Sequence, residues 1–184
     1  MKNKVILNAY ASKYGSTAQI AESIALRLKK AGFEPEVMNA GDVSNLRGYS
    51  AVILGSAVYA GNWLKEAADF LTQFKQDLAL RPVWFFSAGP TGMGDPVEQM
   101  KGWRFPETLQ PLADSIHPRD IAFFHGTLDM EKLRFAEKLI IRALKAPAGD
   151  FRDWEVINAW ADDIAQNLKK ELDQASLNRE QNLK

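Results

Sequence analysis

The chain has 184 residues, 46% of them hydrophobic and 25% charged, and its 23 basic side chains balance its 23 acidic ones. This composition is typical of one soluble globular domain, and its neutrality argues against the positive field that nucleic-acid binding requires. Cysteine is absent, which excludes a disulfide framework, a thiolate nucleophile and a Cys-ligated metal. Any redox chemistry must therefore come from a bound cofactor, and we expect no metal site.

The N-terminus does not resemble a signal peptide, because the apolar run at residues 5–7 is short and no small-residue cleavage site follows it. No apolar run reaches the length of a transmembrane helix. We therefore expect the protein to reside in the cytoplasm.

Apolar runs typical of strands alternate with helical spacing along the first two thirds of the chain. Short strands are predicted at residues 5–9, 34–38, 51–54, 83–86 and 121–124. Helices are predicted after the first and third strands, where apolar side chains recur every three or four residues: Ile20, Ile24 and Leu28, then Leu64, Ala67, Leu71 and Phe74. This alternation indicates βαβ units, and hence an α/β fold with a parallel sheet covered by helices on both faces.

Two more helices are predicted in the last third of the chain. The first contains Leu133 and Ile140 and ends before Pro147, and the second begins after Asp153, which is placed as its N-cap. The polar residues 174–184 are expected to fray. We therefore predict a single domain over residues 1–173, followed by a polar tail.

The loop after the first strand, at residues 12–17, has the composition of an anion site. It reads Ser-Lys-Tyr-Gly-Ser-Thr and leads into a helix N-terminus, where unpaired amides and the helix dipole favour negative charge. The Walker pattern G-x-x-x-x-G-K-[ST] is missing. The glycines at 89, 92 and 94 do not form a dinucleotide fingerprint, because they follow the fourth strand with the wrong spacing. The group implied is therefore a monophosphate. The alternative is a helix start that Ser16 or Thr17 merely caps.

Two further loops are predicted at the same edge of the sheet, which is where open parallel sheets bind ligands. They follow the third and fourth strands, at residues 56–63 and 87–92. Tyr59 and Trp63 could each either face a flat ligand or pack against the protein. Residues 94–117, which include Trp103 and Phe105, are placed to cover the face of such a ligand.

These loops resemble those of flavodoxin-domain proteins. Residues 12–17 are similar to the family's phosphate loop, residues 55–61 (Gly-Ser-Ala-Val-Tyr-Ala-Gly) to its second flavin loop and residues 87–90 (Ser-Ala-Gly-Pro) to its third. The resemblance covers nearly the whole domain and implies a flavodoxin-like, doubly wound sheet of five parallel strands in the order 2-1-3-4-5. It also implies FMN as the cofactor, bound by Ser12, Lys13, Tyr14, Gly15, Ser16, Thr17, Ala57, Val58, Tyr59, Ala60, Gly61, Ser87, Ala88, Gly89, Pro90, Thr91 and Gly92.

The pattern is most similar to the branch of menaquinone-dependent protoporphyrinogen oxidases, which carry an added basic, apolar segment before a Trp-led terminal helix. Here that segment is residues 128–152. The resemblance implies an FMN-dependent oxidoreductase that passes electrons from a small organic substrate to a quinone-type acceptor. The alternatives are an electron carrier, which the zero net charge disfavours because carrier flavodoxins are strongly acidic, and a flavin-binding module without turnover.

No side-chain catalyst is required, because a flavin would perform the chemistry. His125 ends the fifth strand and is a candidate proton relay. A lone histidine at such a place can equally be a structural hydrogen-bond donor.

The added segment contains a predicted amphipathic helix. Its basic face is formed by Arg134, Lys138, Arg142 and Lys145, and its apolar side by Met130, Leu133, Ala136, Ile140 and Leu144. Such a helix can lie on an anionic membrane surface, which would place the protein at the inner face of the membrane. The alternative is a helix that packs on the sheet and leaves its basic face in solvent. Phe135 lies off the main apolar side of this helix. Its position favours a contact with a partner surface or with a second copy of the chain.

Overall fold

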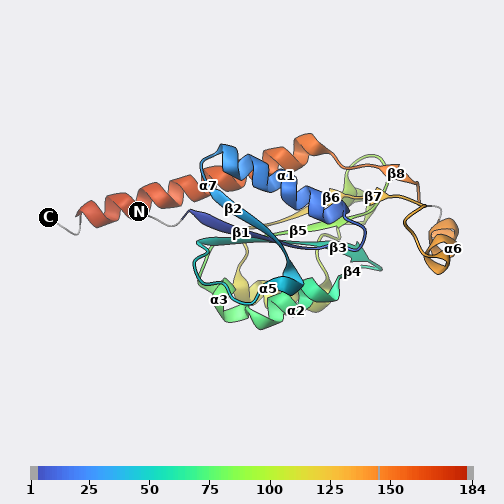
Figure 1. Cartoon of the computed structure of the whole chain (residues 1–184), viewed down its shortest axis with the longest axis horizontal. Coiled ribbons are helices and arrows are strands. Elements are labelled where there is room, and N and C mark those ends of the chain that lie inside the picture. Colours follow the sequence, from blue (N-terminus) through green and yellow to red (C-terminus); the bar gives the residue numbers. More distant parts are fainter. Residues whose placement is uncertain (1–3, 145, 182–184) are drawn as a thin grey trace.

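The structure, a computed structural model, describes residues 4–144 and 146–181 (Figure 1). Its central sheet has five parallel strands in the order β2-β1-β3-β5-β6, so the predicted order 2-1-3-4-5 is confirmed. The strands are β1 (Val5–Ala11), β2 (Glu34–Asn39), β3 (Ala51–Tyr59), β5 (Val83–Gly89) and β6 (Asp120–His125). A two-residue strand, β4 (Asn62–Trp63), turns back and pairs antiparallel with the end of β3.

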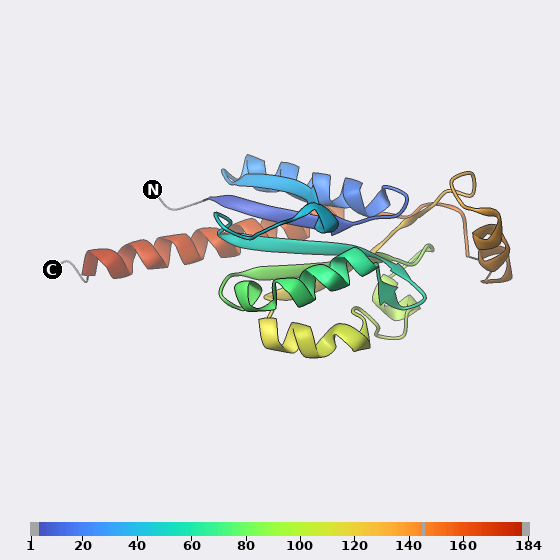
Figure 2. The ribbon, with the colours of Figure 1, turned by 60° about the horizontal axis from the view of Figure 1, so that its bottom comes forward.

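Helices cover both faces of this sheet (Figures 1 and 2). One face carries α1 (Ser16–Lys30) and α7 (Trp154–Gln181). The other carries α2 (Lys65–Gln73), α3 (Lys75–Ala79) and α5 (Gln110–Ile116). Three short helical turns lie in the connections: η1 (Ala40–Asp42), α4 (Pro96–Gln99) and η2 (Glu107–Leu109).

The apolar runs of the strands supply two separate cores, because successive side chains of a strand point to opposite faces of the sheet. In β1, Ile6 packs with the α1 and α7 side, whereas Leu7 packs with the α2, α3 and α5 side. In β5, Trp84 and Phe85 divide in the same way. The central strands are therefore apolar on both faces, as a sheet covered on both sides demands.

The helix α7 begins at its predicted cap. Oδ1 of Asp153 accepts hydrogen bonds from the backbone N–H groups of Glu155 and Val156, at 3.0 and 3.1 Å. We expected fraying beyond Asp173, and in the structure the helix continues to Gln181. Gln, Leu, Arg and Glu prevail there and favour a helix even without an apolar stripe.

Several elements were not predicted. The helix α5 has only seven residues, so its two buried side chains, Ala113 and Ile116, give no readable period. Two short strands, β7 (Thr127–Leu128) and β8 (Gly149–Asp150), pair antiparallel and enclose α6 (Phe135–Leu144). The helix α6 begins later than predicted, so Met130 and Leu133 precede it.

The helix α6 lies beyond the carboxyl edge of the sheet, away from both helix layers (Figures 1 and 2). The alternative that it packs on the sheet is therefore wrong. Lys145 falls outside the described residues, as does the side chain of Leu144. Within the described part of the chain, no helix has both the length and the apolar character needed to cross a membrane.

Candidate cofactor site

The three predicted loops emerge side by side, because the strands that precede them are neighbours. Ala11 of β1 pairs with Ser56 of β3, and Ser56 pairs in turn with Ser87 of β5. The strand order reverses between β1 and β3, where the chain first runs to β2 on one side and then to β3 on the other. This edge is the switch point at which open α/β sheets bind ligands.

The first loop turns sharply into α1. The Ser12 hydroxyl accepts a hydrogen bond from the Gly15 backbone N–H at 3.0 Å. Gly15 has a φ of 89°, a left-handed conformation that side-chain-bearing residues adopt only with strain. The turn therefore directs the first amides of α1 toward one point beyond the sheet.

The hydroxyl of Ser16 is the most informative atom of this loop. It is buried and, within the described residues, has no hydrogen-bond partner. The helix begins without any side-chain cap, so the alternative of a merely capped helix start does not apply. An unpartnered buried hydroxyl costs about 1–3 kcal/mol, which a bound acceptor such as a phosphate oxygen would offset. The first turn of α1 carries no acidic residue that would repel such an anion.

Lys13 and Tyr14 point to a carboxylate that the sequence did not identify. Both side chains donate to Glu137 of α6, which also accepts from the Arg134 backbone N–H at 2.9 Å. The hydrogen bond from Lys13, followed by that from Tyr14, lowers the pKa of Glu137 to about 2. The Lys13 charge is thereby neutralised at the edge of the loop.

The second loop is a tight hairpin. Val58 and Tyr59 pair with Trp63 and Asn62, and Ala60 and Gly61 form the turn with φ values of 49° and 74°. Tyr59 is 41% exposed, and the Lys13 ammonium lies 5.3 Å from its ring centroid. Partial burial raises the pKa of Tyr59 to about 12. Its ring lies beside Lys13 of the loop at residues 12–17.

Trp63, in contrast, is a core residue. Its ring is buried edge-on against Phe105 and Phe85, with centroids 4.8 and 5.7 Å apart. Its indole N–H donates to the Ser87 hydroxyl at 2.8 Å, and that hydroxyl donates to the Arg104 carbonyl at 2.8 Å. Ser87 and Ala88 are therefore buried beneath the third loop, and Ser87 supports the loop from below.

The third loop proper consists of Gly89, Pro90, Thr91 and Gly92, which are half-buried at the edge of the sheet. A Cβ at Gly89 would lie 2.8 Å from the Phe123 ring, so the close approach of this strand end requires glycine. His125 is buried, and its ring nitrogens lie 3.0 and 2.8 Å from the carbonyl oxygens of Pro90 and Gly94. This geometry supports the structural alternative for His125, in which the ring fastens the loop.

In the segment expected to cover a bound ligand, the aromatic side chains of Trp103 and Phe105 pack against other parts of the protein. Phe105 belongs to the core, so the expectation that it faces the ligand is wrong. Trp103 packs edge-on against Phe123 at 5.1 Å, beside a hollow of about 370 Å³ along the edge strand β6. Phe105 was misplaced because an aromatic in a loop carries no periodicity that separates a core position from a ligand contact.

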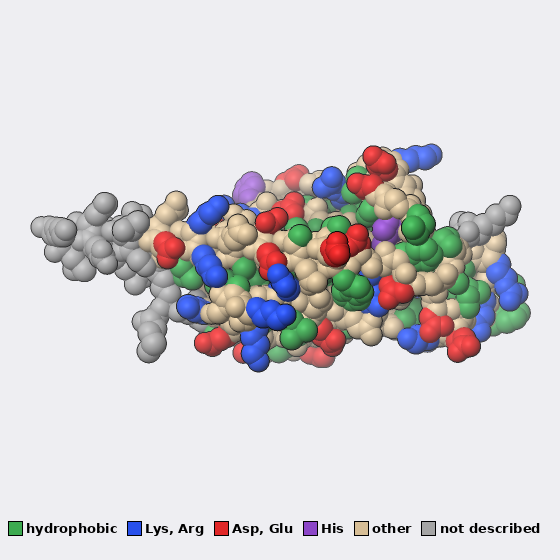
Figure 3. Space-filling view, turned by 90° about the horizontal axis from the view of Figure 1, so that it is seen from above, with side chains coloured by type: hydrophobic (Ala, Val, Ile, Leu, Met, Phe, Trp, Pro, Cys, Tyr) green, Lys and Arg blue, Asp and Glu red, His purple; other side chains and the backbone are tan. Residues whose placement is uncertain are grey.

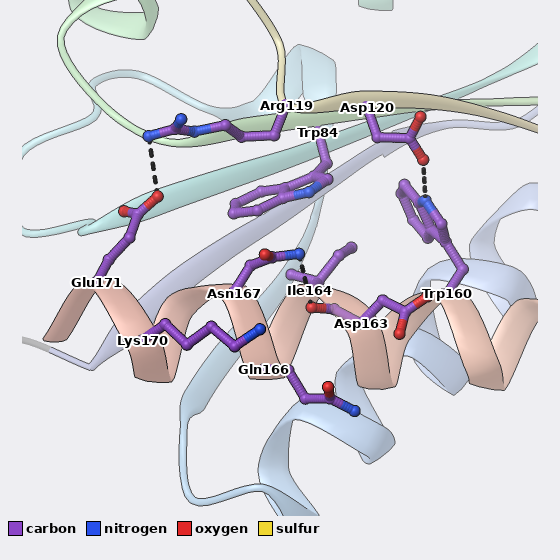
Figure 4. Close-up of a pocket in the computed structure, with 10 residues that line it drawn as sticks. All are labelled: Trp84, Arg119, Asp120, Trp160, Asp163, Ile164, Gln166, Asn167, Lys170 and Glu171. Carbon is purple, nitrogen blue, oxygen red and sulfur yellow. Dashed lines mark hydrogen bonds and ion pairs between the residues drawn. The ribbon is translucent and has the colours of Figure 1, made fainter. Parts of the chain in front are cut away.

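A cavity of about 410 Å³ lies at the opposite, amino end of β5 and β6, where α7 crosses the sheet (Figure 4). Several of its polar groups pair with one another. Arg119 pairs with Glu171 at 2.8 Å, and the Trp160 indole N–H donates to Asp120 at 2.7 Å. Among the described residues, no fully buried side-chain polar atom of this cavity is left unpartnered as the Ser16 hydroxyl is, and the carboxyl edge remains the candidate site.

Comparisons with known proteins identify the family and the fold. A model of the flavodoxin domain matches residues 7–155, whereas comparison with curated protein sequences found no match. Similar solved structures include a flavodoxin from the domain Archaea (TM-score 0.59, 14% identity, 90% of this chain and 99% of that chain). They also include a Streptococcus pneumoniae TIGR4 flavodoxin (TM-score 0.56, 15% identity, 89% and 99%).

The rubredoxin oxygen:oxidoreductase of the anaerobe Desulfovibrio gigas is similar as well (TM-score 0.61, 16% identity). The match covers 92% of this chain but only 37% of that protein. At these identities the solved structures establish the fold, and the match of the domain model over most of the chain establishes the family. The protein belongs to the flavodoxin domain family.

Proposed function

We propose that the protein binds FMN at the three loops of the carboxyl edge and transfers electrons through it. The observation that carries the proposal is the buried hydroxyl of Ser16 at the start of α1, which has no partner in the part of the chain that the structure describes. A donor in that position fits a phosphate oxygen, since a hydroxyl donates well to an anion and the helix N-terminus adds its positive end.

The phosphate loop would bind the dianion mainly through neutral donors. The Lys13 ammonium is already paired with Glu137 and the Gly15 amide with the Ser12 hydroxyl, so the attraction must come from the Ser16 hydroxyl and the amides of residues 16 and 17. Tyr59 and the backbone at Gly89 and Gly92 would flank a flat ring and exclude water from it. Bound FMN supplies the redox chemistry, and the protein sets its potential through hydrogen bonds and nearby charge.

The test compares FMN with riboflavin, which lacks the phosphate. Apoprotein is titrated with each flavin, and protein variants carry Ser16→Ala or the matched change Ser23→Ala. Ser23 lies on the same helix but donates to Asn158 at 3.0 Å, away from the loop. Ser16→Ala should weaken FMN binding about 10- to 100-fold, the value of one hydrogen bond to a charged group, and leave riboflavin binding unchanged. Equal FMN affinity in the Ser16→Ala and Ser23→Ala variants contradicts the proposal.

A second candidate function is that of an oxidoreductase with a quinone-type acceptor, of the kind that the protoporphyrinogen oxidase pattern implies. Two observations favour it over an electron carrier, which would dock on its partners through an acidic surface. The net charge of the chain is zero, and the helix α6 is joined to the phosphate loop through Glu137. Holoprotein is offered a menaquinone analogue with protoporphyrinogen or a chemical reductant as donor. Multiple turnovers with the quinone support this function, whereas exchange with protein partners alone supports a carrier.

A further inference from the structure

The helix α6 presents its apolar side to solvent. Phe135 is 78% exposed, Leu139 51% and Ile140 59%. The side that faces the protein is instead the one with Glu137, whose carboxylate contacts Lys13 and Tyr14. An amphipathic helix of a globular domain normally buries its apolar stripe. The orientation of α6 is the reverse, and an exposed apolar face of this kind marks an interaction site.

Contacts at both ends of the added segment hold this orientation in place. At the start of α6, Glu137 joins the phosphate loop. At the other end, the buried Arg152 pairs with Asp150 of β8, at 2.8 Å between Nε and Oδ1, and donates to the Gln19 side chain at 2.6 Å. The guanidinium of Arg152 also lies 4.5 Å from the Trp154 ring centroid. The segment is thus fastened to the first turns of α1 and α7 while its apolar face points away.

Positive charge accompanies the exposed apolar face. Arg134 and Arg142 are exposed, and Lys138 lies between them on the same side of α6. Figure 3 shows basic and hydrophobic side chains together at the end of the molecule where α6 lies. The single carboxylate of the helix, Glu137, is engaged by Lys13, so it does not cancel this charge toward solvent.

We propose that α6 docks on an anionic lipid surface, with Phe135, Leu139 and Ile140 in the boundary between headgroups and acyl chains and with the three cations on the headgroups. An interfacial helix needs this pairing of an apolar face with basic residues. Docking brings the carboxyl edge of the sheet to the membrane, because the phosphate loop contacts α6 directly. The proposal requires no bound flavin.

The first experiment is flotation of the full-length protein with vesicles. One set contains phosphatidylcholine alone, and the other contains phosphatidylcholine mixed with phosphatidylglycerol. We expect binding to the anionic vesicles, weaker binding to the neutral ones, and a loss of binding as the salt concentration rises.

The second experiment uses two α6 variants with matched controls on α1. Arg134→Gln with Arg142→Gln should lower the partition coefficient on the order of 25-fold, since each basic residue near such a surface contributes about one factor of five. Its control is Lys29→Gln with Lys30→Gln, two exposed basic residues in the last turn of α1. Phe135→Ser with Ile140→Ser should lower binding at least about tenfold. Its control is Leu26→Ser, at an exposed and isolated leucine of α1.

FMN titration of every variant checks the fold and separates this proposal from the proposed function. Absence of vesicle binding, equal binding to neutral and anionic vesicles, or equal effects of the α1 and α6 changes overturns the proposal. Light scattering without vesicles tests whether a second copy of the chain, and not lipid, binds the apolar face of α6. If the wild-type protein dimerises and Phe135→Ser with Ile140→Ser makes it monomeric, a second copy covers α6 and the lipid proposal is wrong.

Discussion

The helices α6 and α7 have similar amphipathic patterns but opposite placements. The apolar residues of α7, among them Ile157, Ala161 and Ile164, are buried against the sheet. Those of α6, among them Leu139 and Ile140, are exposed. A hydrophobic stripe predicts that a helix has something to cover, but the pattern carries no information on whether the partner lies within the chain. Polar contacts over long sequence separations, such as Lys13 with Glu137, decide the placement of α6.

The largest expected difference between the two helices is in the stability lost when an apolar side chain is truncated. Ile164→Ala in α7 should lower the free energy of unfolding by about 2–5 kcal/mol, because the buried Ile164 side chain is replaced by a cavity. Ile140→Ala in α6 should change it by no more than about 0.5 kcal/mol, as an exposed substitution does. Urea denaturation of both variants measures this. Comparable losses would mean that α6 packs on the domain in solution.

A smaller difference is expected at the helix starts. Asp153→Ala removes the cap of α7, whose carboxylate accepts from two backbone amides, and should cost about 1 kcal/mol of stability. The matched change is Asp129→Ala, whose carboxylate accepts from the Glu131 backbone N–H in the added segment, outside the two cores. We expect no change in the global unfolding midpoint for Asp129→Ala. A shift as large as that of Asp153→Ala would show that the added segment unfolds together with the sheet.

The smallest effect is a local dependence on pH. The pKa of Glu137 is about 2 in the folded protein, below its ordinary value of 4.5, because the ionised form accepts from Lys13 and Tyr14. Its contribution to holding α6 is therefore complete above pH 4.5 and is lost as the pH falls toward 2. The protection factors of the α6 amides, which are corrected for the intrinsic exchange rate at each pH, should fall over this range while those of the α7 amides stay high. In the Glu137→Gln variant, α6 should exchange rapidly at every pH. Unchanged protection of α6 in this variant would contradict the claim that Glu137 holds α6 in place.

The elements that the sequence predicted well are those with local signals. The strand runs around Ile6, Val52 and Phe85 are apolar on both sides, and alternation with helices leaves few sheet orders once right-handed crossovers are required. The composition of the phosphate loop likewise placed Ser16 correctly at the start of α1. These features follow from residues close together in the chain, so no knowledge of distant contacts was needed.

The features that the sequence did not predict depend on distant partners. Nothing near Glu137 indicates that its carboxylate contacts Lys13, which lies 124 positions away. The buried position of Arg152 beside Gln19 is equally invisible, since an arginine in a polar stretch is usually solvent-exposed. Trp63 and Tyr59 are both aromatic residues of the same loop. Only the register of the hairpin decides that the Trp63 ring lies in the core and the Tyr59 ring is exposed.

The central claim is that the carboxyl edge binds the phosphate of FMN. Its most direct test is a titration of folded apoprotein with FMN and with riboflavin, followed by flavin fluorescence. We predict saturation at one FMN per chain, with riboflavin bound much more weakly because the donors around Ser16 have no phosphate to contact. Equal affinity for the two flavins, or no uptake of FMN by the folded protein, would contradict the claim.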